Sequence, residues 1–410
     1  MQPGTRVESA LNKISALLTP KRVLLYALAL TIITWFFFFM IHIRARAFGV
    51  TPGADFIAFY TAAQIAGTTP EKLYDVPTQQ SIQQQIRPDL PPTRHWHYLY
   101  PPFFAIPLLA LAPLTYLQAY WAWTTASLIL YALSILILVS LLPAAAEAGS
   151  IFVIAASAPA LIWCLLTGQT TALSLFLWIL AFYWIKRGKP FFSGFTLGLL
   201  SYRFQYLILL APILLLKKFW MPILGLAISS SALIVTGGWV LSVRSYADYF
   251  ETVLVMSERI GEKLQPLPKY ISIYAFFRPL LPNSVTISLT MLVMAILVYW
   301  LAQMWRGSLR PGKPTFDLQF SMTLTMTLLL THQGLIYDLL LLTVPALIIY
   351  ENRSWFPPYY KLLLLLLYFA PYYAPIIAEK TGVNPTQPLL IWLTYEIYRG
   401  SERMRLSSSG

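Results

Sequence analysis

Charged residues are scarce in this sequence. Only 11% of its 410 residues are charged and 58% are apolar, whereas an average soluble domain carries about 25% charged residues. One globule has too little interior to hide that apolar surplus, so the lipid bilayer must act as the solvent. The composition therefore excludes an ordinary soluble enzyme and predicts an integral membrane protein.

Cysteine and nucleotide-binding motifs are scarce as well. The single cysteine, Cys164, lies in an apolar run, which excludes an internal disulfide or a thiolate metal cluster and indicates a small buried hydrophobe. The loops hold no glycine-rich nucleotide fingerprint, no Walker lysine and no Asp-x-Asp pair. His95 and His97 come nearest to a metal pair, but they have no third ligand nearby. We expect no cofactor and no metal, and we expect His97 to contact an acceptor or a lipid headgroup.

The charges that are present follow the ends of the apolar runs. The formal net charge of +13 could suggest nucleic-acid binding, but the 29 basic residues are dispersed rather than clustered. When the short basic connections are placed in the cytoplasm they hold more than half of these residues, as the positive-inside rule requires. We therefore expect no nucleic-acid partner and use the basic residues to assign topology.

Apolar runs that could span about 30 Å of hydrocarbon recur along most of the chain. The first, 23–43, is followed by no small-residue cleavage site, so we interpret it as an anchor. The later segments are 191–217 (a tight out-and-back pair), 220–241, 284–304, 316–331, 335–350, 358–378 and 386–398. We predict an all-α polytopic membrane protein of about 12 transmembrane helices, with both termini in the cytoplasm and one domain over residues 1–410.

The region between residue 99, outside, and Lys186, inside, leaves a choice open. It contains four apolar runs, although parity demands an odd number of crossings. One run must be re-entrant, or two must merge. The four are 101–116, 117–142, 150–167 and 169–185.

Two outer loops, 44–99 and 242–283, are too long to be simple connections. In the first, residues 55–67 place Phe56, Phe59, Tyr60 and Ala63 on one helical face and close with glycine, which predicts a short helix in the membrane interface. A second such helix is expected over 76–86. In the other loop, apolar residues from Tyr246 to Leu254 form a similar stripe.

Asp55 stands directly before the first of these helices. Aspartate is a preferred N-cap, so capping alone could explain it. A carboxylate at the outer membrane surface is also a competent base for an acceptor hydroxyl that attacks a sugar carbon. The residues alone leave both interpretations open.

Several motifs, taken in order, resemble glycosyltransferase family 87, the polyprenol-phosphate-mannose-dependent mannosyltransferases of the type C glycosyltransferase fold. The resemblance extends over roughly residues 50–350. It is carried by Gly53-Ala-Asp55-Phe56 with Tyr60, Ala62-Ala63 and Leu73-Tyr74-Asp75; by Tyr100-Pro101-Pro102-Phe103-Phe104; by Gly168-Gln169, Gly194, Gly198-Leu199-Leu200, Arg203 and Gln205; and by Tyr337-Asp338-Leu339 ahead of Pro345-Ala346-Leu347. Arg203-Phe204-Gln205 departs from a commoner Lys-Pro-Gln form but keeps the cation.

The resemblance implies an inverting transfer with Asp55 as the catalytic base, while Asp75 is expected to be a cap or turn residue. Arg203 is expected to bind the donor phosphate, or else to extend to the headgroups as an anchor. His332 is expected to assist at the phosphate, with a structural role as its alternative. Residues 168–170 are expected to break a helix. Substrate contacts are expected from Tyr60, His97, Tyr100, Gln169, Gln205 and Tyr337.

These features favour a membrane glycosyltransferase that moves a sugar, with mannose expected, from a polyprenyl phosphate to a lipid or glycan acceptor. The expected location is the bacterial inner membrane, surrounded by membrane lipids, with the active site on the periplasmic side. A transporter or flippase of lipid-linked saccharides is the alternative, but such proteins commonly show internal repeats, and none stands out here. A structural partner is a third class, which would leave Asp55 and Arg203 unexplained.

Overall fold

The structure, a computed structural model, describes residues 3–47, 52–88, 95–146, 149–263, 269–306, 311–331 and 334–409. Its elements are α1 (Pro3–Ala16), α2 (Pro20–Ala47), α3 (Phe56–Thr68), η1 (Pro70–Lys72), α4 (Val76–Ile86), α5 (Pro102–Leu108), η2 (Leu109–Leu111), α6 (Tyr116–Ser140), α7 (Pro143–Ala146), α8 (Ser150–Ala156), α9 (Pro159–Thr167), α10 (Thr171–Lys186), α11 (Pro190–Gly198), η3 (Leu199–Tyr206), α12 (Leu210–Leu216), α13 (Trp220–Leu241), α14 (Arg244–Lys263), α15 (Ile273–Phe277), α16 (Asn283–Met304), α17 (Pro314–Leu330), η4 (Ile336–Leu342), α18 (Thr343–Glu351), η5 (Arg353–Trp355), α19 (Tyr360–Thr381) and α20 (Thr386–Ser409).

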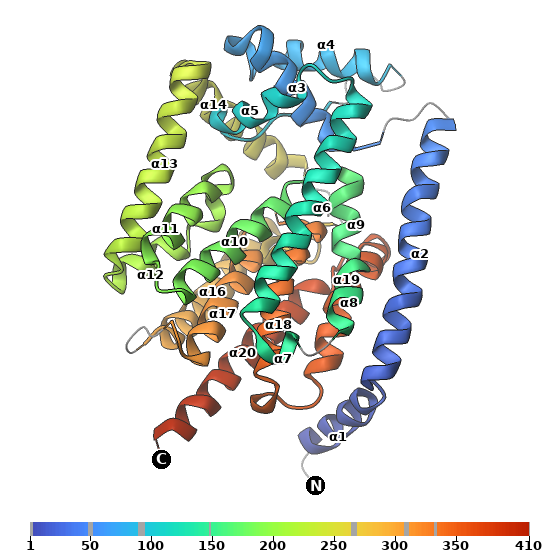
Figure 1. Ribbon diagram of the computed structural model, residues 1–410, viewed down its shortest axis with the longest axis vertical. Coiled ribbons are helices and arrows are strands. Elements are labelled where there is room, and N and C mark those ends of the chain that lie inside the picture. The colour runs from blue at the N-terminus through green and yellow to red at the C-terminus, as the bar shows by residue number, and fades with distance from the viewer. Residues whose placement is uncertain are drawn as a thin grey trace.

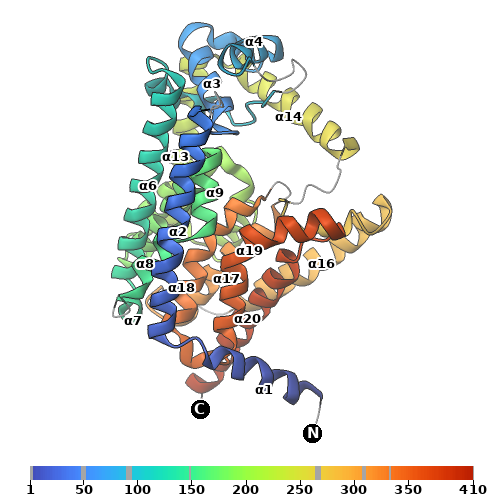
Figure 2. The same cartoon turned by 90° about the vertical axis from the view of Figure 1, so that its right-hand side faces the viewer.

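These helices form an elongated bundle whose two termini lie at the same end (Figures 1 and 2). The opposite end, which we call the α3 end, carries α3, α4, α5 and α14 (Figure 1). Within the described ranges no strand forms, and β pairing is limited to a bridge between Tyr270 and Leu335. The prediction of an all-α architecture is confirmed.

Six described helical segments are long and apolar enough to cross a membrane: Pro20–Arg44, Tyr116–Ser140, Ser150–Thr167, Trp220–Leu241, Asn283–Met304 and Tyr360–Thr381. Their outward faces are apolar; on α2, for example, Phe36 and Phe37 are 57% and 58% exposed. Such a surface is stable only against lipid, so the chain is a polytopic membrane protein. The larger count of about 12 crossings, drawn from helix length, stays a prediction.

The first of the four apolar runs between residues 101 and 185 forms α5 and η2. Both pack against α3 at the α3 end and do not run along the bundle (Figure 1). The chain turns at Thr115, whose hydroxyl and Gln118 form a capping box that starts α6. The run 101–116 therefore folds at the α3 end, while α6, the pair α8 and α9, and α10 correspond to the other three runs. Which of the four runs cross the membrane stays a prediction.

The long outer loops fold partly as expected. The helix predicted over 76–86 is α4, with those bounds. The helix predicted over 55–67 is confirmed as α3, but the prediction that only one of its faces is buried is wrong, since α3 is buried on nearly every side. Protein covers it, because α4, α5, η2 and α6 all pack on it. By contrast, α14 leaves Phe250 and Leu254 60% and 63% exposed, and its interfacial role stays a prediction.

Small residues bring α11 and α13 into close contact. A Cβ atom added at Gly194 would collide with the carbonyl of Pro222, and one at Gly225 would collide with the carbonyl of Phe191. Close backbone approach through glycine is typical of helix pairs in membranes, where dispersion contacts replace the hydrophobic effect. This contact fixes α11, and therefore also η3, which continues it into the interior.

Candidate functional site

Asp55 lies immediately before α3, with its backbone N–H bonded to the carbonyl of Thr167 at 3.0 Å. Its own backbone is helical and its side chain makes no cap hydrogen bond, so the capping interpretation is wrong. The carboxylate instead turns to a loop far along the chain. Its Oδ2 accepts a hydrogen bond of 2.7 Å from Nε2 of Gln169.

Gln169 reaches Asp55 because the chain turns sharply between α9 and α10. Gly168 has a φ of +74°, in the left-handed region, and a Cβ atom there would collide with the side chain of Phe56. Only glycine combines that backbone conformation with that closeness. The predicted helix break over residues 168–170 is confirmed.

Arg203 lies at a kink within η3, where its φ of −124° and ψ of 63° leave the helical region. Its side chain is buried, so the alternative of an anchor extending to the headgroups is wrong. Nη1 bonds Oδ1 of Asp338 and the hydroxyl of Tyr206, both at 2.6 Å. Nη2 donates to Oε1 of Gln169 at 3.2 Å and approaches the Tyr100 hydroxyl at 3.4 Å.

Asp338 is the acidic partner that the sequence analysis did not assign. Its Oδ1 also accepts from the Thr171 hydroxyl at 2.8 Å, while Oδ2 accepts from the backbone N–H of Leu335 at 3.1 Å. A buried charge pair is maintained only when the remaining lone pairs and protons are also bonded, as they are here. The available signal was an isolated acid in an apolar run, which usually marks a functional position or a paired charge.

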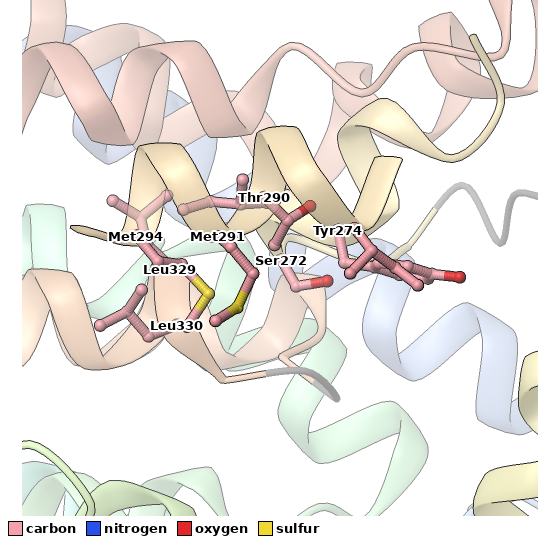
Figure 3. Close-up of a pocket in the computed structure, with 9 residues that line it drawn as sticks. Ser272, Tyr274, Thr290, Met291, Met294, Leu329 and Leu330 are labelled. Carbon is pink, nitrogen blue, oxygen red and sulfur yellow. The ribbon is translucent and has the colours of Figure 1, made fainter. Parts of the chain in front are cut away.

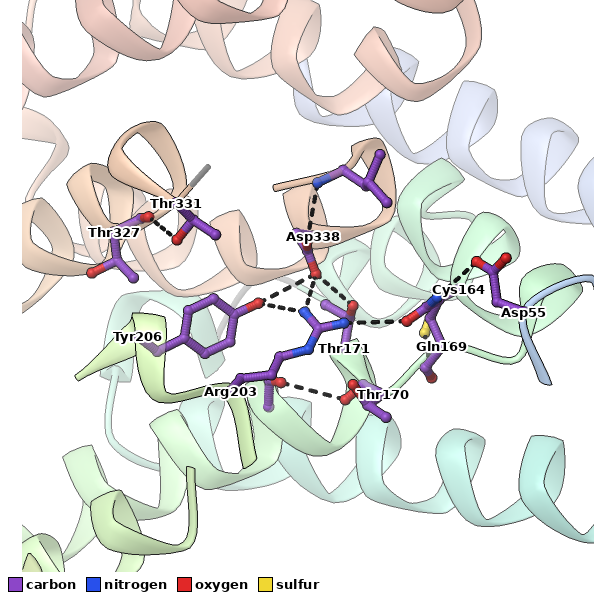
Figure 4. A network of polar contacts seen from close by, with 12 residues as sticks. Asp55, Cys164, Gln169, Thr170, Thr171, Arg203, Tyr206, Thr327, Thr331 and Asp338 are labelled. Atoms are coloured by element: carbon purple, nitrogen blue, oxygen red, sulfur yellow. Dashed lines mark hydrogen bonds and ion pairs between the residues drawn. The ribbon is translucent and has the colours of Figure 1, made fainter. Parts of the chain in front are cut away.

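Together these contacts form one continuous chain from Asp55 through Gln169 and Arg203 to Asp338 (Figure 4). Gln169 connects the two halves, since its amide NH₂ donates to the carboxylate and its oxygen accepts from the guanidinium. In the reverse orientation the Gln169 NH₂ would face the Arg203 guanidinium, donor against donor, so the network selects a single amide orientation. Four separate parts of the fold thus fix the direction of the Asp55 carboxylate.

The surroundings of Asp55 favour its protonated form more than water would. Burial raises the pKa of Asp55 above its usual range, whereas the Gln169 hydrogen bond, the charge of Lys269, a Trp96 hydrogen bond and the charge of Arg203 lower it. A base is most effective when its pKa approaches the working pH. The site therefore holds a carboxylate whose basicity is raised and whose orientation is fixed.

The other predicted residues divide between this network and the surrounding structure. Tyr100 borders the network, because its hydroxyl lies 3.4 Å from both Arg203 Nη2 and Thr170 Oγ1. Tyr60 instead donates its hydroxyl to the carbonyl of Leu114 at 2.8 Å, so that hydroxyl is occupied by the backbone. Tyr337 is buried beside Asp338.

The remaining expectations have separate outcomes. The His97 ring lies 3.2 Å from that of His95, measured between ring nitrogens. The half-buried Gln205 side chain forms no hydrogen bond with any described residue. His332 lies outside the described residues. Asp75 accepts from the N–H of Thr78 at 2.9 Å, which confirms it as the cap of α4. Across the described ranges no group of three or more potential metal ligands comes together.

Comparison with known proteins gives one match. The model of glycosyltransferase family 87 matches residues 98–331, which is more than half of the chain and includes Tyr100, Gln169 and Arg203. No curated protein and no solved structure matches the chain. Because the match covers more than half of the chain, this membrane protein belongs to glycosyltransferase family 87.

Proposed function

We propose that the protein transfers a sugar, mannose, from a polyprenyl-phosphate donor to an acceptor hydroxyl of a lipid or glycan, with inversion. The observation that carries this proposal is the half-buried Asp55 carboxylate, which neither caps α3 nor forms an ion pair with a described residue. It accepts hydrogen bonds from the neutral side chains of Gln169 and Trp96. A carboxylate in that state is free to accept a proton.

The reaction needs one base and one good leaving group. The acceptor oxygen forms a bond to the anomeric carbon, while the bond from that carbon to the donor phosphate oxygen breaks. The hydroxyl proton passes to Asp55, and the polyprenyl phosphate leaves with the bonding electrons. The other acid of the network, Asp338, already bonds Arg203 and Thr171, so it is not available as a nucleophile. A single displacement inverts the anomeric centre.

Arg203 supports this reaction indirectly, through its contact with Gln169. Its guanidinium is engaged by Asp338, Tyr206 and Gln169, which favours a positioning role through Gln169. Direct phosphate binding by Arg203 stays a prediction, as does a contact from His332. Tyr100, on the border of the network, is the best placed of the predicted substrate contacts.

The proposed location is the bacterial inner membrane, with Asp55 on the periplasmic side. Cys164 is fully buried, so added cysteines can be labelled against a low background. A cysteine placed at Lys72 should react with an impermeant reagent added outside intact cells. A cysteine placed at Lys189 should react with the same reagent only after the cells are permeabilised. The reverse pattern contradicts the orientation.

The deciding experiment is transfer by purified protein in detergent, with synthetic polyprenyl-phosphate sugars as donors. Detergent offers no second leaflet, so turnover of a donor distinguishes an enzyme from a flippase. Asp55→Asn should abolish turnover. Asp75→Asn removes an acid from the same loop that only caps α4, and it should retain activity. Equal activity of both variants contradicts the proposal.

A further inference from the structure

The network of described residues around Asp55 offers no unpaired cation to stabilise the negative charge of a departing phosphate. Arg203 is its one internal cation among the described residues, and Asp338 neutralises it at 2.6 Å. Phosphate leaving groups in enzymes are stabilised by cations aimed at the developing charge. If the donor is a phosphate ester, a second cation near Asp55 would stabilise the charge of its leaving group.

Lys269 is such a cation. It is exposed, it forms no ion pair with a described residue, and its charge lowers the pKa of Asp55. Its Nζ lies 5.1 Å from the centroid of the Trp163 ring on α9. That helix ends at Thr167, whose carbonyl bonds the backbone of Asp55. The ammonium group thus contacts the helix that ends against Asp55, and its charge acts on that carboxylate.

The backbone of Lys269 is attached to the same network. Its carbonyl accepts from the N–H of Ile336 at 3.0 Å, and the N–H of Ile271 donates to Gly334 at 2.9 Å. Leu335, between these partners, donates to Asp338. Residue 269 is therefore positioned by the segment that also orients the Arg203 ion pair.

An apolar cavity begins three residues further on. It holds about 230 Å³ and lies between α15, α16 and α17, with Ser272 at one side and Met291, Met294, Leu329 and Leu330 among its lining (Figure 3). Met291 is 63% exposed, so the cavity opens to the apolar outer face of α16. Three residues of chain reach at most about 10 Å. Lys269 and an apolar cavity that opens to lipid are thus separated by only three residues of chain.

We propose that residues 269–274 form a donor clamp in which Lys269 binds the phosphate of the lipid-linked sugar and this cavity receives the adjoining isoprenoid chain. The inference rests on the proposed function and names the part of the site that holds the donor. An ammonium suits a phosphate as a point charge. The two methionines of its lining, Met291 and Met294, suit a flexible branched chain because methionine adapts its shape.

The test measures binding rather than turnover. Polyprenyl phosphate and the matching polyprenol are titrated into purified protein in detergent. Three variants, Lys269→Ala, Lys269→Arg and Met291→Trp, and two control variants, Lys72→Ala and Ile296→Trp, are each compared with the unaltered chain. Lys72 is an exposed lysine of the first outer loop, and Ile296 is an exposed residue of α16 outside the cavity.

Lys269→Ala should weaken binding of polyprenyl phosphate about ten- to hundred-fold, as expected for a lost charged contact, and leave polyprenol binding unchanged. Lys269→Arg should restore most of the loss. Met291→Trp should weaken both ligands, because the larger side chain enters the cavity mouth. Both controls should bind like the unaltered chain.

Unchanged binding of the phosphate by Lys269→Ala, or of both ligands by Met291→Trp, overturns the clamp. So does full competition by excess phosphatidylglycerol, which would identify a general phospholipid site. Because binding is read directly, a protein that transfers sugar with a dispensable Lys269 refutes the clamp alone. A protein that binds polyprenyl phosphate through Lys269 but turns over no donor refutes the proposed function alone.

Discussion

Replacing Asp55 by asparagine separates catalysis from structure at this site. Asparagine keeps the size of aspartate, and its side-chain oxygen can still accept the 2.7 Å hydrogen bond from Gln169. It cannot accept a proton. Loss of a general base costs about 10²- to 10⁴-fold in rate, or about 3 to 5 kcal/mol of transition-state stabilisation.

The same substitution should not destabilise the fold. Burial raises the pKa of Asp55 in the folded protein, so the folded chain holds the proton more firmly than the unfolded chain does. The stability that this contributes is present below the unfolded pKa and is lost as pH rises through the folded pKa. At neutral pH the ionised carboxylate therefore lowers the free energy of unfolding, and asparagine removes this effect. The melting temperature of Asp55→Asn should equal or exceed that of the unaltered chain.

The assay is initial-rate transfer at saturating donor, with melting temperature measured on the same preparations. Activity above a tenth of that of the unaltered chain refutes the role of Asp55 as base. Lost activity together with a lowered melting temperature would show that the charge is structural, held against Lys269 and Arg203. Low activity with an unchanged or higher melting temperature supports the reasoning.

Three further outcomes are expected. Gln169→Leu removes a hydrogen bond that lowers the pKa of Asp55, so the acidic limb of the pH–rate profile should move to higher pH; an unmoved limb contradicts the role of Gln169. Asp338→Asn leaves the buried Arg203 charge uncompensated and should cost about 3 to 5 kcal/mol of folding stability, measured by denaturant unfolding. Adding Arg203→Met to this variant should recover much of the stability but not the activity. Gly225→Val should lower stability by about 1 to 3 kcal/mol through overpacking, seen as a lower melting temperature, whereas Gly149→Ala, with no atom within 4 Å of the added Cβ, should not.

Much of the secondary structure followed from the sequence because its causes are local. A helix in lipid must satisfy its own backbone, so apolar runs and the residues that interrupt them predict helices directly. The run 220–241 is α13, and the helix expected over 76–86 is α4. Gly168 and Asp75 were likewise assigned correctly, since a helix break and an N-cap depend on a few neighbouring residues.

The predictions about exposure were less successful. A pattern of apolar residues shows that one face of α3 is buried but cannot show that protein also covers the other faces. Likewise, hydropathy assigns the run 101–116 to an apolar environment without saying whether it crosses the bundle. Its packing against α3 at the α3 end decides that question.

By itself, then, the sequence determined the membrane setting, most helices and the candidates Asp55, Gln169 and Arg203. Only the tertiary structure decided how these candidates act together. Gln169 and Asp55 are 114 residues apart, and Arg203 and Asp338 are 135 apart. No local pattern encodes such contacts, because they depend on how the turns at Gly168 and Arg203 are packed against η4. For that reason the pairing of Arg203 with Asp338 became visible only in the fold.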